Sequence, residues 1–487
     1  MTTRHTFFGH PWGLATLSAT ELWERFSFYG MRALLVLYLV AALETSDASQ
    51  SGLGFDAGDA AAVYGSYNAL VYLTPLAGGW IADRLIGARR SVLVGGIIIA
   101  LGHYSMAAPW EGMFWAGLLL IAAGTGLLKP NVSQMVGDLY VGQPESRKDA
   151  AFSIFYMGIN MGGFLAPLVT GWLALSYGWE WGFLAAGIGM TIAIVIYVVG
   201  WPSLGSAGSV TPNPATRAVL RRVLVRTGAG LGLFALAVLG YGLWAGFSVE
   251  GVTVVLTWAI IAIAVVYFVV LFRSPLVTSA DRPKLKAFMA LFIGAALFWM
   301  LFDQAGSTLT ILASDWTDRS IGSWVVPAPW LLSVNPVLII IFAPVFAWLW
   351  TKLANRAPST PMKFAIAIIG VGLSFWLLII PGMAADRGES SMIWWLLGAY
   401  LLQTWSELLL SPTGLAASTT LAPVGLGSQM LGLWFLAASV GDAVGGQVVR
   451  LFSGYGFGPF FGVLGSIAVL VGIGYVFLAR RVSHLMR

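Results

Sequence analysis

A small set of ionisable side chains lies inside long apolar segments of the sequence. Placing such a group at the centre of a bilayer costs at least about 2.5–3.5 kcal/mol, so these groups mark ion or substrate pathways. Carboxylates can carry protons, and together with cations they can bind a zwitterionic ligand, the cations holding its carboxylate and an anion holding its amine. The members of this set are Glu21, Glu24, Arg25, Arg32, Lys129, Asp303, Glu407 and Asp442.

One apolar segment, residues 17–43, carries half of this set on a single helical face. At 3.6 residues per turn, six of its polar or aromatic residues share an arc of about 140°. A face with two carboxylates, two guanidinium groups and a phenol cannot point at lipid. These six residues are Glu21, Glu24, Arg25, Phe28, Tyr29 and Arg32.

The carboxylates of the set outnumber its cations. One or two carboxylates therefore lack a fixed cationic partner, and in a partly dry cavity such a group takes up a proton more readily than in water. Lys129 directly precedes Pro130, and Glu407 comes shortly before Pro412. Because proline bends a helix, a proline beside a charge suits both gating and the exposure of backbone carbonyls to a cavity. The alternative is that the prolines only ease packing.

The composition predicts an integral membrane protein. The 487 residues are 58% hydrophobic and 10% charged, with a mean hydropathy of +0.83, whereas soluble domains carry roughly 25% charged residues. The absence of cysteine excludes thiolate chemistry, and the four scattered histidines do not predict a zinc site. Without a nucleophile–base constellation or a phosphate-binding loop, we expect no enzyme, no metal and no cofactor. The first residues do not resemble a signal peptide.

Apolar runs of about 20 residues predict fourteen membrane spans. Most of the 26 basic residues fall in alternate connecting segments, which predicts that both termini are cytoplasmic. The spans lie near 17–43, 60–82, 91–107, 112–137, 151–174, 180–200, 228–246, 252–273, 287–312, 330–351, 364–383, 392–421, 428–450 and 457–479.

The spans divide into six, two and six. The middle pair carries no charge within its spans apart from the terminal Arg273, and it follows a linker rich in Pro, Gly and Ser. We therefore predict an N-terminal six-helix bundle at 1–203, a linker and inserted helical hairpin at 204–275, and a C-terminal six-helix bundle at 276–487. Two six-helix halves are the repeat plan of the major facilitator fold, in which the charged spans line a central cavity.

Several motifs resemble one family. Glu21–Gly30 reads ELWERFSFYG, similar to ExxERFxYYG, and Phe155–Pro167 reads FYMGINMGGFLAP, similar to FYxxINxG. Gly78–Arg90, GGWIADRLIGARR, is similar to the less specific facilitator loop motif. With FWMLFDQAGSTL and SELLLSPTGL in the second half, the whole chain resembles the bacterial members of the proton-dependent oligopeptide transporter (POT/PTR) family of the major facilitator superfamily.

The resemblance implies a proton-coupled symporter that imports di- and tripeptides across the cytoplasmic (inner) membrane by alternating access. It implies a multi-pass monomer that uses protons as its coupling ion, with no nucleic acid partner. The alternative on the same scaffold is a proton-coupled transporter of nitrate, a drug or an amino-acid derivative. A channel is a further alternative. The near-balanced opposite charges argue against a channel and favour alternating salt bridges.

The resemblance also implies roles for individual residues. The predicted proton-coupling residues are Glu21, Glu24, Arg25 and Asp303. The predicted substrate-binding residues are Arg32 and Lys129 for the peptide carboxylate, Glu407 and Asn335 for its amine, Tyr29, Tyr67 and Asn160 as hydrogen-bonding groups, and Trp434 as a wall. The predicted gating salt bridges are Arg32–Asp303 on the outside and Lys129–Glu407 on the inside.

Some of these positions have a plainer interpretation. Tyr67 and Trp434 could be packing residues, Asn160 could bridge two helices, and Asn335 could cap the backbone beside Pro336. Asp442 is left outside the predicted site as a packing or water-facing residue. The sequence also departs from the family twice, with Phe28 in place of a tyrosine and Asp303 in place of a glutamate.

Overall fold

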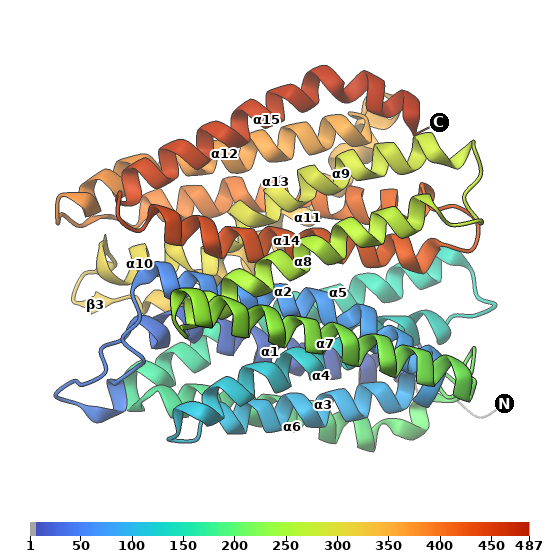
Figure 1. Ribbon diagram of the computed structural model, residues 1–487, viewed down its shortest axis with the longest axis horizontal. Helices are drawn as coiled ribbons and strands as arrows, with labels where there is room; N and C mark the ends of the chain where they lie inside the picture. The colour runs from blue at the N-terminus through green and yellow to red at the C-terminus, as the bar shows by residue number, and fades with distance from the viewer. Residues whose placement is uncertain (1–5, 487) are drawn as a thin grey trace. The chain divides into compact units, whose positions relative to one another are not determined.

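The computed structural model describes residues 6–486 and is built from long helices (Figure 1). In the first part of the chain these are α1 (Trp12–Val40), α2 (Ala57–Ile81), α3 (Ala88–Met106), α4 (Glu111–Asp138), α5 (Glu145–Tyr177) and α6 (Trp179–Val199). Next come α7 (Arg217–Ala245) and α8 (Val249–Phe272). The remainder are α9 (Asp281–Phe302), α10 (Thr308–Asp315), α11 (Val334–Leu353), α12 (Thr360–Asp386), α13 (Trp394–Thr420), α14 (Gly427–Phe452) and α15 (Phe457–Leu485).

The predicted all-α membrane fold is confirmed. Each predicted span corresponds to one helix, with α9 and α10 together forming the ninth. Among residues 6–486, ten helical segments are long and apolar enough to cross a membrane by length and composition. The other long helices among the described residues, α1, α2, α3 and α13, contain polar or charged residues that lower their hydropathy.

The predicted bounds were too short at several helix ends. Helix α5 begins at Glu145 rather than at 151, and α7 begins at Arg217 rather than at 228. Hydropathy detects only the turns inside lipid, so the polar first turns of these helices escape it. Two small strand pairs were also not predicted: β1 (Thr317–Asp318) pairs in parallel with β4 (Ser391–Met392), and β2 (Ser320–Ile321) pairs antiparallel with β3 (Trp324–Val325).

The chain forms two compact units. The first contains the chain up to Leu53 and Leu73–Leu233, and the second contains Gly54–Tyr72 and the chain from Phe234 onward. Their limits fall just before α2, inside α2 and inside α7, so the three-part division at 203 and 275 stays a prediction. In the first unit α1 packs against α5 and α6, and α3 packs against α4 and α6. In the second, α12 packs against α13 and α15, and α14 packs against α8 and α9.

Arg89 fastens the segment between α6 and α7 to the first unit. Its Nε donates to the Ala207 carbonyl at 3.0 Å, and its Nη2 donates to the carbonyls of Gly205 and Ala207 at 2.6 and 2.8 Å. The guanidinium also lies over the Trp201 ring, 5.3 Å from its centroid. The arginine of the loop motif therefore satisfies backbone carbonyls that no regular element pairs.

Arg89→Ala is expected to release this segment. Hydrogen bonds from charged groups contribute about 1.5–3 kcal/mol each, so local opening should become at least about tenfold more frequent. Trypsin cleavage at Arg217 of the purified protein measures this opening. Arg90→Ala is the matched control, because Arg90 is the exposed neighbour. Equal cleavage rates for both variants would show that Arg89 does not hold the segment.

Candidate functional site

Glu21, Glu24 and Arg25 form a buried ionic cluster on α1. Arg25 is in bidentate contact with Glu24, through Nη2 to Oε1 at 2.6 Å and through Nε to Oε2. The same Nε lies 3.2 Å from Oε1 of Glu21. Glu24 is 0% exposed, and Glu21 and Arg25 are each 3% exposed. Two carboxylates therefore share one guanidinium away from water.

The two carboxylates of this cluster are not equivalent. Both oxygens of Glu24 contact Arg25, whereas the second oxygen of Glu21, Oε2, has no hydrogen-bond partner among the described residues. A buried ionised oxygen without a partner is costly, and a proton on that carboxyl removes its charge. Glu24 is thus the ion-pair partner in this arrangement, and Glu21 is the carboxyl placed to accept a proton.

Phe28 contributes to the cluster in place of the family's tyrosine. The Arg25 guanidinium lies over the Phe28 ring, 5.0 Å from its centroid, and the ring packs edge-on against Tyr29 with centroids 5.3 Å apart. An aromatic face attracts a cation more strongly in a desolvated setting. The departure therefore leaves the contact with Arg25 in place and removes only a hydroxyl group.

Gly162 of α5 lets the helix that carries the INMGG sequence approach this cluster. A Cβ added at Gly162 would lie 2.2 Å from the Leu22 carbonyl oxygen and 3.0 Å from the Arg25 Cβ. Such distances are far below van der Waals contact, so only glycine fits between α1 and α5 here. The glycine of the FYxxINxG motif therefore positions Arg25.

Gly162→Ala is expected to lower the thermal stability of the purified protein and to impair transport by displacing Arg25. Overpacking of this kind costs about 1–3 kcal/mol. Gly137→Ala is the matched control, since a Cβ at that helical position would meet nothing within 4 Å. A Gly162→Ala protein as stable and as active as the Gly137→Ala protein would contradict this packing.

Two further predicted residues of the first unit lie within electrostatic reach of the cluster. The charge of Lys129 on α4 interacts with those of Glu21, Glu24, Arg25 and Arg32. Two more cations, Arg32 on α1 and Lys129 on α4, therefore lie near the cluster. Arg32 is buried and Lys129 half-buried.

Asn160, the remaining predicted residue of this unit, is buried on α5. Its Nδ2 donates to the Tyr156 carbonyl at 3.0 Å, one turn earlier on the same helix. The plainer interpretation was that Asn160 bridges two helices, but this hydrogen bond lies within α5. The contact uses Nδ2 of Asn160 and does not involve its amide oxygen.

In the second unit, Glu407 and Asn335 are brought together from α13 and α11. The Asn335 Nδ2 donates to Glu407 Oε2 at 2.9 Å and to Thr404 Oγ1 at 3.0 Å. Asn335 therefore acts on a side chain of another helix rather than as a local backbone cap. Thr404, which the sequence did not single out, completes this group from one turn before Glu407.

Trp434 and Tyr67 are both buried in the second unit, on α14 and α2. The Trp434 ring lies against Gly414 of α13 so closely that a Cβ there would be 2.1 Å from it. It also packs edge-on against Phe364 of α12, with centroids 6.3 Å apart. Trp434 therefore packs among three helices, which fixes the orientation of its ring.

Asp303 lies where the ninth span is interrupted. After α9 ends at Phe302, residues 303–306 form a tight helical turn before α10, and Ser307 and Thr308 both donate to Oε1 of Gln304. A Cβ at Gly306 would be 1.8 Å from the Tyr64 hydroxyl, so glycine is required at this break.

Two carboxylates line a small cavity beside the break. Its volume is about 10 Å³, room for about one water molecule. Asp303 and Asp442, which are 5% and 3% exposed, both line it, with Tyr64, Gln304 and Ser307. The sequence interpretation had left Asp442 outside the site, and the structure places it beside Asp303.

Comparison with known proteins identifies the family. A sequence model of the POT family, PTR2, matches residues 89–457. The chain belongs to the POT family. It is 41% identical over 468 residues to the uncharacterized transporter YclF of Bacillus subtilis (strain 168), covering 96% of this chain and 93% of that one. It is 38% identical over 498 residues to a di-/tripeptide transporter of Lactococcus lactis subsp. cremoris, covering 99% and 98%.

A solved structure shows the same fold. The crystal structure of a peptide transporter POT in complex with sulfate superposes with a TM-score of 0.92 at 40% identity, covering 99% of this chain and 97% of that one. The resemblance read from the motifs is thereby confirmed for the family and the fold. The roles of the individual site residues stay predictions.

The two units of this POT-family chain hold different parts of the predicted site. Glu21, Glu24, Arg25, Arg32 and Lys129 belong to the first unit. The second unit contains Tyr67, Asp303, Asn335, Glu407 and Trp434. Each predicted gating salt bridge joins residues of different units and stays a prediction. Within residues 6–486, no three His, Cys, Asp or Glu side chains are grouped to hold a metal ion.

Proposed function

We propose that this POT-family transporter is a symporter that couples the uptake of di- and tripeptides to protons by alternating access. The observation that carries the proposal is the buried cluster in which Glu21 and Glu24 share Arg25. A proton on one carboxyl changes how the guanidinium is held, so protonation and helix position become linked. The Lactococcus lactis di-/tripeptide transporter, 38% identical along the chain, supports a peptide substrate.

The charges of each unit fit one end of a zwitterionic peptide. Arg32 and Lys129 bind its carboxylate, and Glu407, held by Asn335, binds its amine. Tyr29, Tyr67 and Asn160 hydrogen-bond the peptide, and Trp434 supplies an apolar wall. Asp303 is a further proton-coupling residue, and the pairs Arg32–Asp303 and Lys129–Glu407 close the outer and inner gates in turn. No covalent step and no cofactor is part of this cycle.

The proposal places the protein in the cytoplasmic membrane as a monomer with both termini inside. The alternation of basic residues supports this orientation. Because the native chain has no cysteine, single cysteines at Ser274 and Ser483 report the orientation cleanly. Both should react with a membrane-impermeant maleimide only after the membrane is opened. Labelling of either residue from outside intact cells would reverse the assigned orientation.

Uptake of labelled dialanine into proteoliposomes tests the function directly. An inward proton gradient should drive accumulation above the external concentration, and an ionophore that collapses the gradient should reduce uptake to equilibration. Unlabelled dialanine should compete, whereas nitrate should not. Nitrate competition without peptide competition would refute the peptide assignment, and uptake that ignores the gradient would refute the coupling.

A further inference from the structure

Helix α7 carries a concentrated basic segment at its start. Arg217, Arg221, Arg222 and Arg226 are all exposed, and residues 204–249 contain no Asp or Glu. No salt bridge among the described residues involves these four arginines. The protein itself therefore supplies no carboxylate that neutralises them along this helix.

The length of α7 places these arginines at the surface of the bilayer. Its 29 residues span about 43 Å at 1.5 Å per residue. The uncharged part, residues 227–245, covers about 28 Å, which matches the roughly 30 Å hydrocarbon core. The remaining turns, Arg217–Arg226, extend about 15 Å beyond it, through the layer where lipid headgroups lie.

Other parts of the protein cover little of this helix. Gly242 is the only buried residue in α7, and apolar side chains on several sides are exposed, including Leu224, Leu231, Leu236 and Leu243. Headgroups therefore have access to the arginines from more than one direction.

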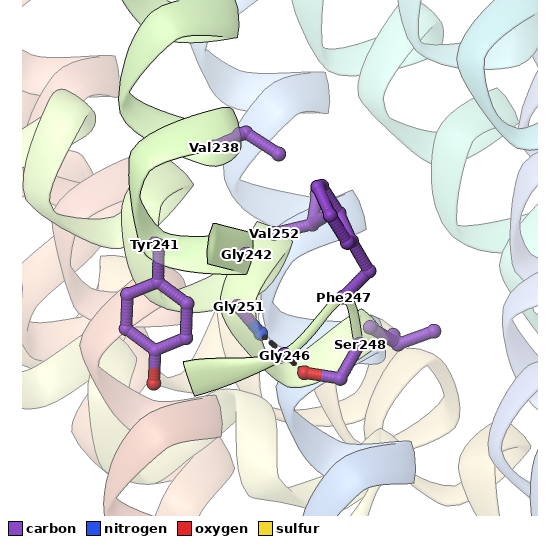
Figure 2. Close-up of a pocket in the computed structure, with 9 residues that line it drawn as sticks. Val238, Tyr241, Gly242, Gly246, Phe247, Ser248, Gly251 and Val252 are labelled. Atoms are coloured by element: carbon purple, nitrogen blue, oxygen red, sulfur yellow. Dashed lines mark hydrogen bonds between the residues drawn. The ribbon is translucent and has the colours of Figure 1, made fainter. Parts of the chain in front are cut away.

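The opposite end of α7 is held by a tight turn into α8 (Figure 2). The Phe247 ring lies against Gly242, where a Cβ would be 2.5 Å from it, and Tyr241 lies equally close to Gly251. The Ser248 hydroxyl accepts a hydrogen bond from the Gly251 amide at 3.2 Å. This turn joins the C-terminal end of α7 closely to the start of α8.

The spacing of the arginines forms two pairs on opposite sides of the helix. Arg217 and Arg221 are four residues apart, as are Arg222 and Arg226, so the members of each pair are neighbours on the helix surface. The second pair is turned by about 140° from the first. Like charges one turn apart destabilise a helix, and an anion held between them removes this repulsion.

We propose that each pair binds the phosphate of an anionic phospholipid, which makes α7 a two-site lipid anchor. The guanidinium fork matches a phosphate group and binds it with two parallel hydrogen bonds. Basic clusters next to a membrane helix attract anionic headgroups. If these residues served only to set the membrane topology, any positive charge would be sufficient. Neither arginine nor this paired spacing would be needed. The proposal is independent of the transported substrate and of the orientation in the membrane.

Native mass spectrometry of the delipidated full chain in neutral detergent tests the anchor, with phosphatidylglycerol as the probe. We expect two phosphatidylglycerol molecules to bind more tightly than phosphatidylcholine does. The attraction between one arginine and an anionic membrane surface corresponds to about fivefold in affinity. Arg222→Gln with Arg226→Gln should therefore lose one lipid, with affinity reduced about 25-fold, and Arg217→Gln with Arg221→Gln should lose the other.

The matched control is Arg480→Gln with Arg481→Gln, an exposed basic pair on α15, which should leave both lipids bound. Arg222→Lys with Arg226→Lys keeps the positive charge and should give an affinity between those of the native and glutamine proteins. Equal affinities for the arginine, lysine and glutamine pairs, or an equal loss in the α15 control, would overturn the proposal. Displacement of the lipid by equimolar inorganic phosphate would also overturn it, because the site would then take a free anion.

Discussion

Glu21→Gln is expected to abolish accumulation of peptide driven by a proton gradient while peptide exchange continues. Glutamine has the shape of a protonated glutamate but cannot release a proton. It can still accept from the Arg25 Nε, which lies 3.2 Å from the Glu21 carboxylate. The bidentate contact between Arg25 and Glu24 is untouched by the change. Binding and rocking therefore persist, and only the coupling to protons is lost.

Two assays on the same proteoliposomes separate these activities. Accumulation of labelled dialanine under an inward proton gradient should fall to equilibration, a loss of at least about tenfold. Exchange of internal unlabelled for external labelled dialanine, without a gradient, should stay within about twofold of the native rate. Glu145→Gln, at an exposed glutamate in the first turn of α5, should change neither activity. Full driven uptake by Glu21→Gln would move the coupling site elsewhere, with Asp303 as the next candidate.

Glu24→Gln is expected to cause the same loss for a different reason. This change removes the charge from the carboxylate that holds Arg25 through two contacts, and Arg25 should then pair with Glu21. Because a carboxylate paired with a cation binds a proton less readily, driven uptake should also be lost. Full driven uptake by Glu24→Gln would show that the charge of this carboxylate is not needed for coupling.

The cluster on α1 could be predicted from the sequence because helical periodicity alone places its members on one face. Glu21 and Arg25 are four residues apart, and their contact follows from this spacing. The bidentate contact of Arg25 with its immediate neighbour Glu24 does not follow, since adjacent residues point in different directions on a helix. It forms because both side chains are long and buried together, where an unpaired charge would be costly.

Other parts of the site depend on contacts between distant segments, and no local pattern indicates them. The interruption of the ninth span requires Gly306 because the Tyr64 hydroxyl, from α2, lies where a Cβ would be. Asp442 joins Asp303 only because α14 packs against the end of α9. The partners of Arg89 are backbone carbonyls, which every residue possesses and which therefore leave no signature in the sequence.

The predicted helices were too short at their ends for a related reason. Hydropathy locates the part of a helix that lies in lipid, and it detects neither the polar turns at the start of α5 nor the arginine-rich turns of α7. The polar residues that lower the hydropathy of α1 are the same residues that identify it as functional. For α1 the chemistry of the side chains was thus more informative than their apolarity.

Removal of a charge from the peptide site is expected to change affinity according to which end of the peptide is free. Lys129→Ala should weaken binding of free dialanine far more than binding of its C-terminal amide, because Lys129 is one of the two cations proposed to bind the peptide carboxylate. Glu407→Gln should weaken binding of free dialanine far more than of N-acetylated dialanine. A hydrogen bond between charged groups contributes about 1.5–3 kcal/mol, so each loss should be roughly ten- to a hundredfold.

Competition of each blocked and free peptide against labelled dialanine in the exchange assay measures these affinities without a proton gradient. Asn335→Ala should act in the same direction as Glu407→Gln but more weakly. The change removes the Asn335 amide, which donates to Oε2 of Glu407 at 2.9 Å, but it leaves the charge of Glu407 intact. Lys352→Ala, at an exposed lysine that lies over the Trp348 ring at the end of α11, is the control and should alter none of the affinities. The discriminating quantity is the ratio of losses for free and blocked peptides. If Lys129→Ala and Glu407→Gln each weakened all three peptides equally, the proposed polarity of the site would be wrong, because neither residue would then recognise a terminus of the peptide.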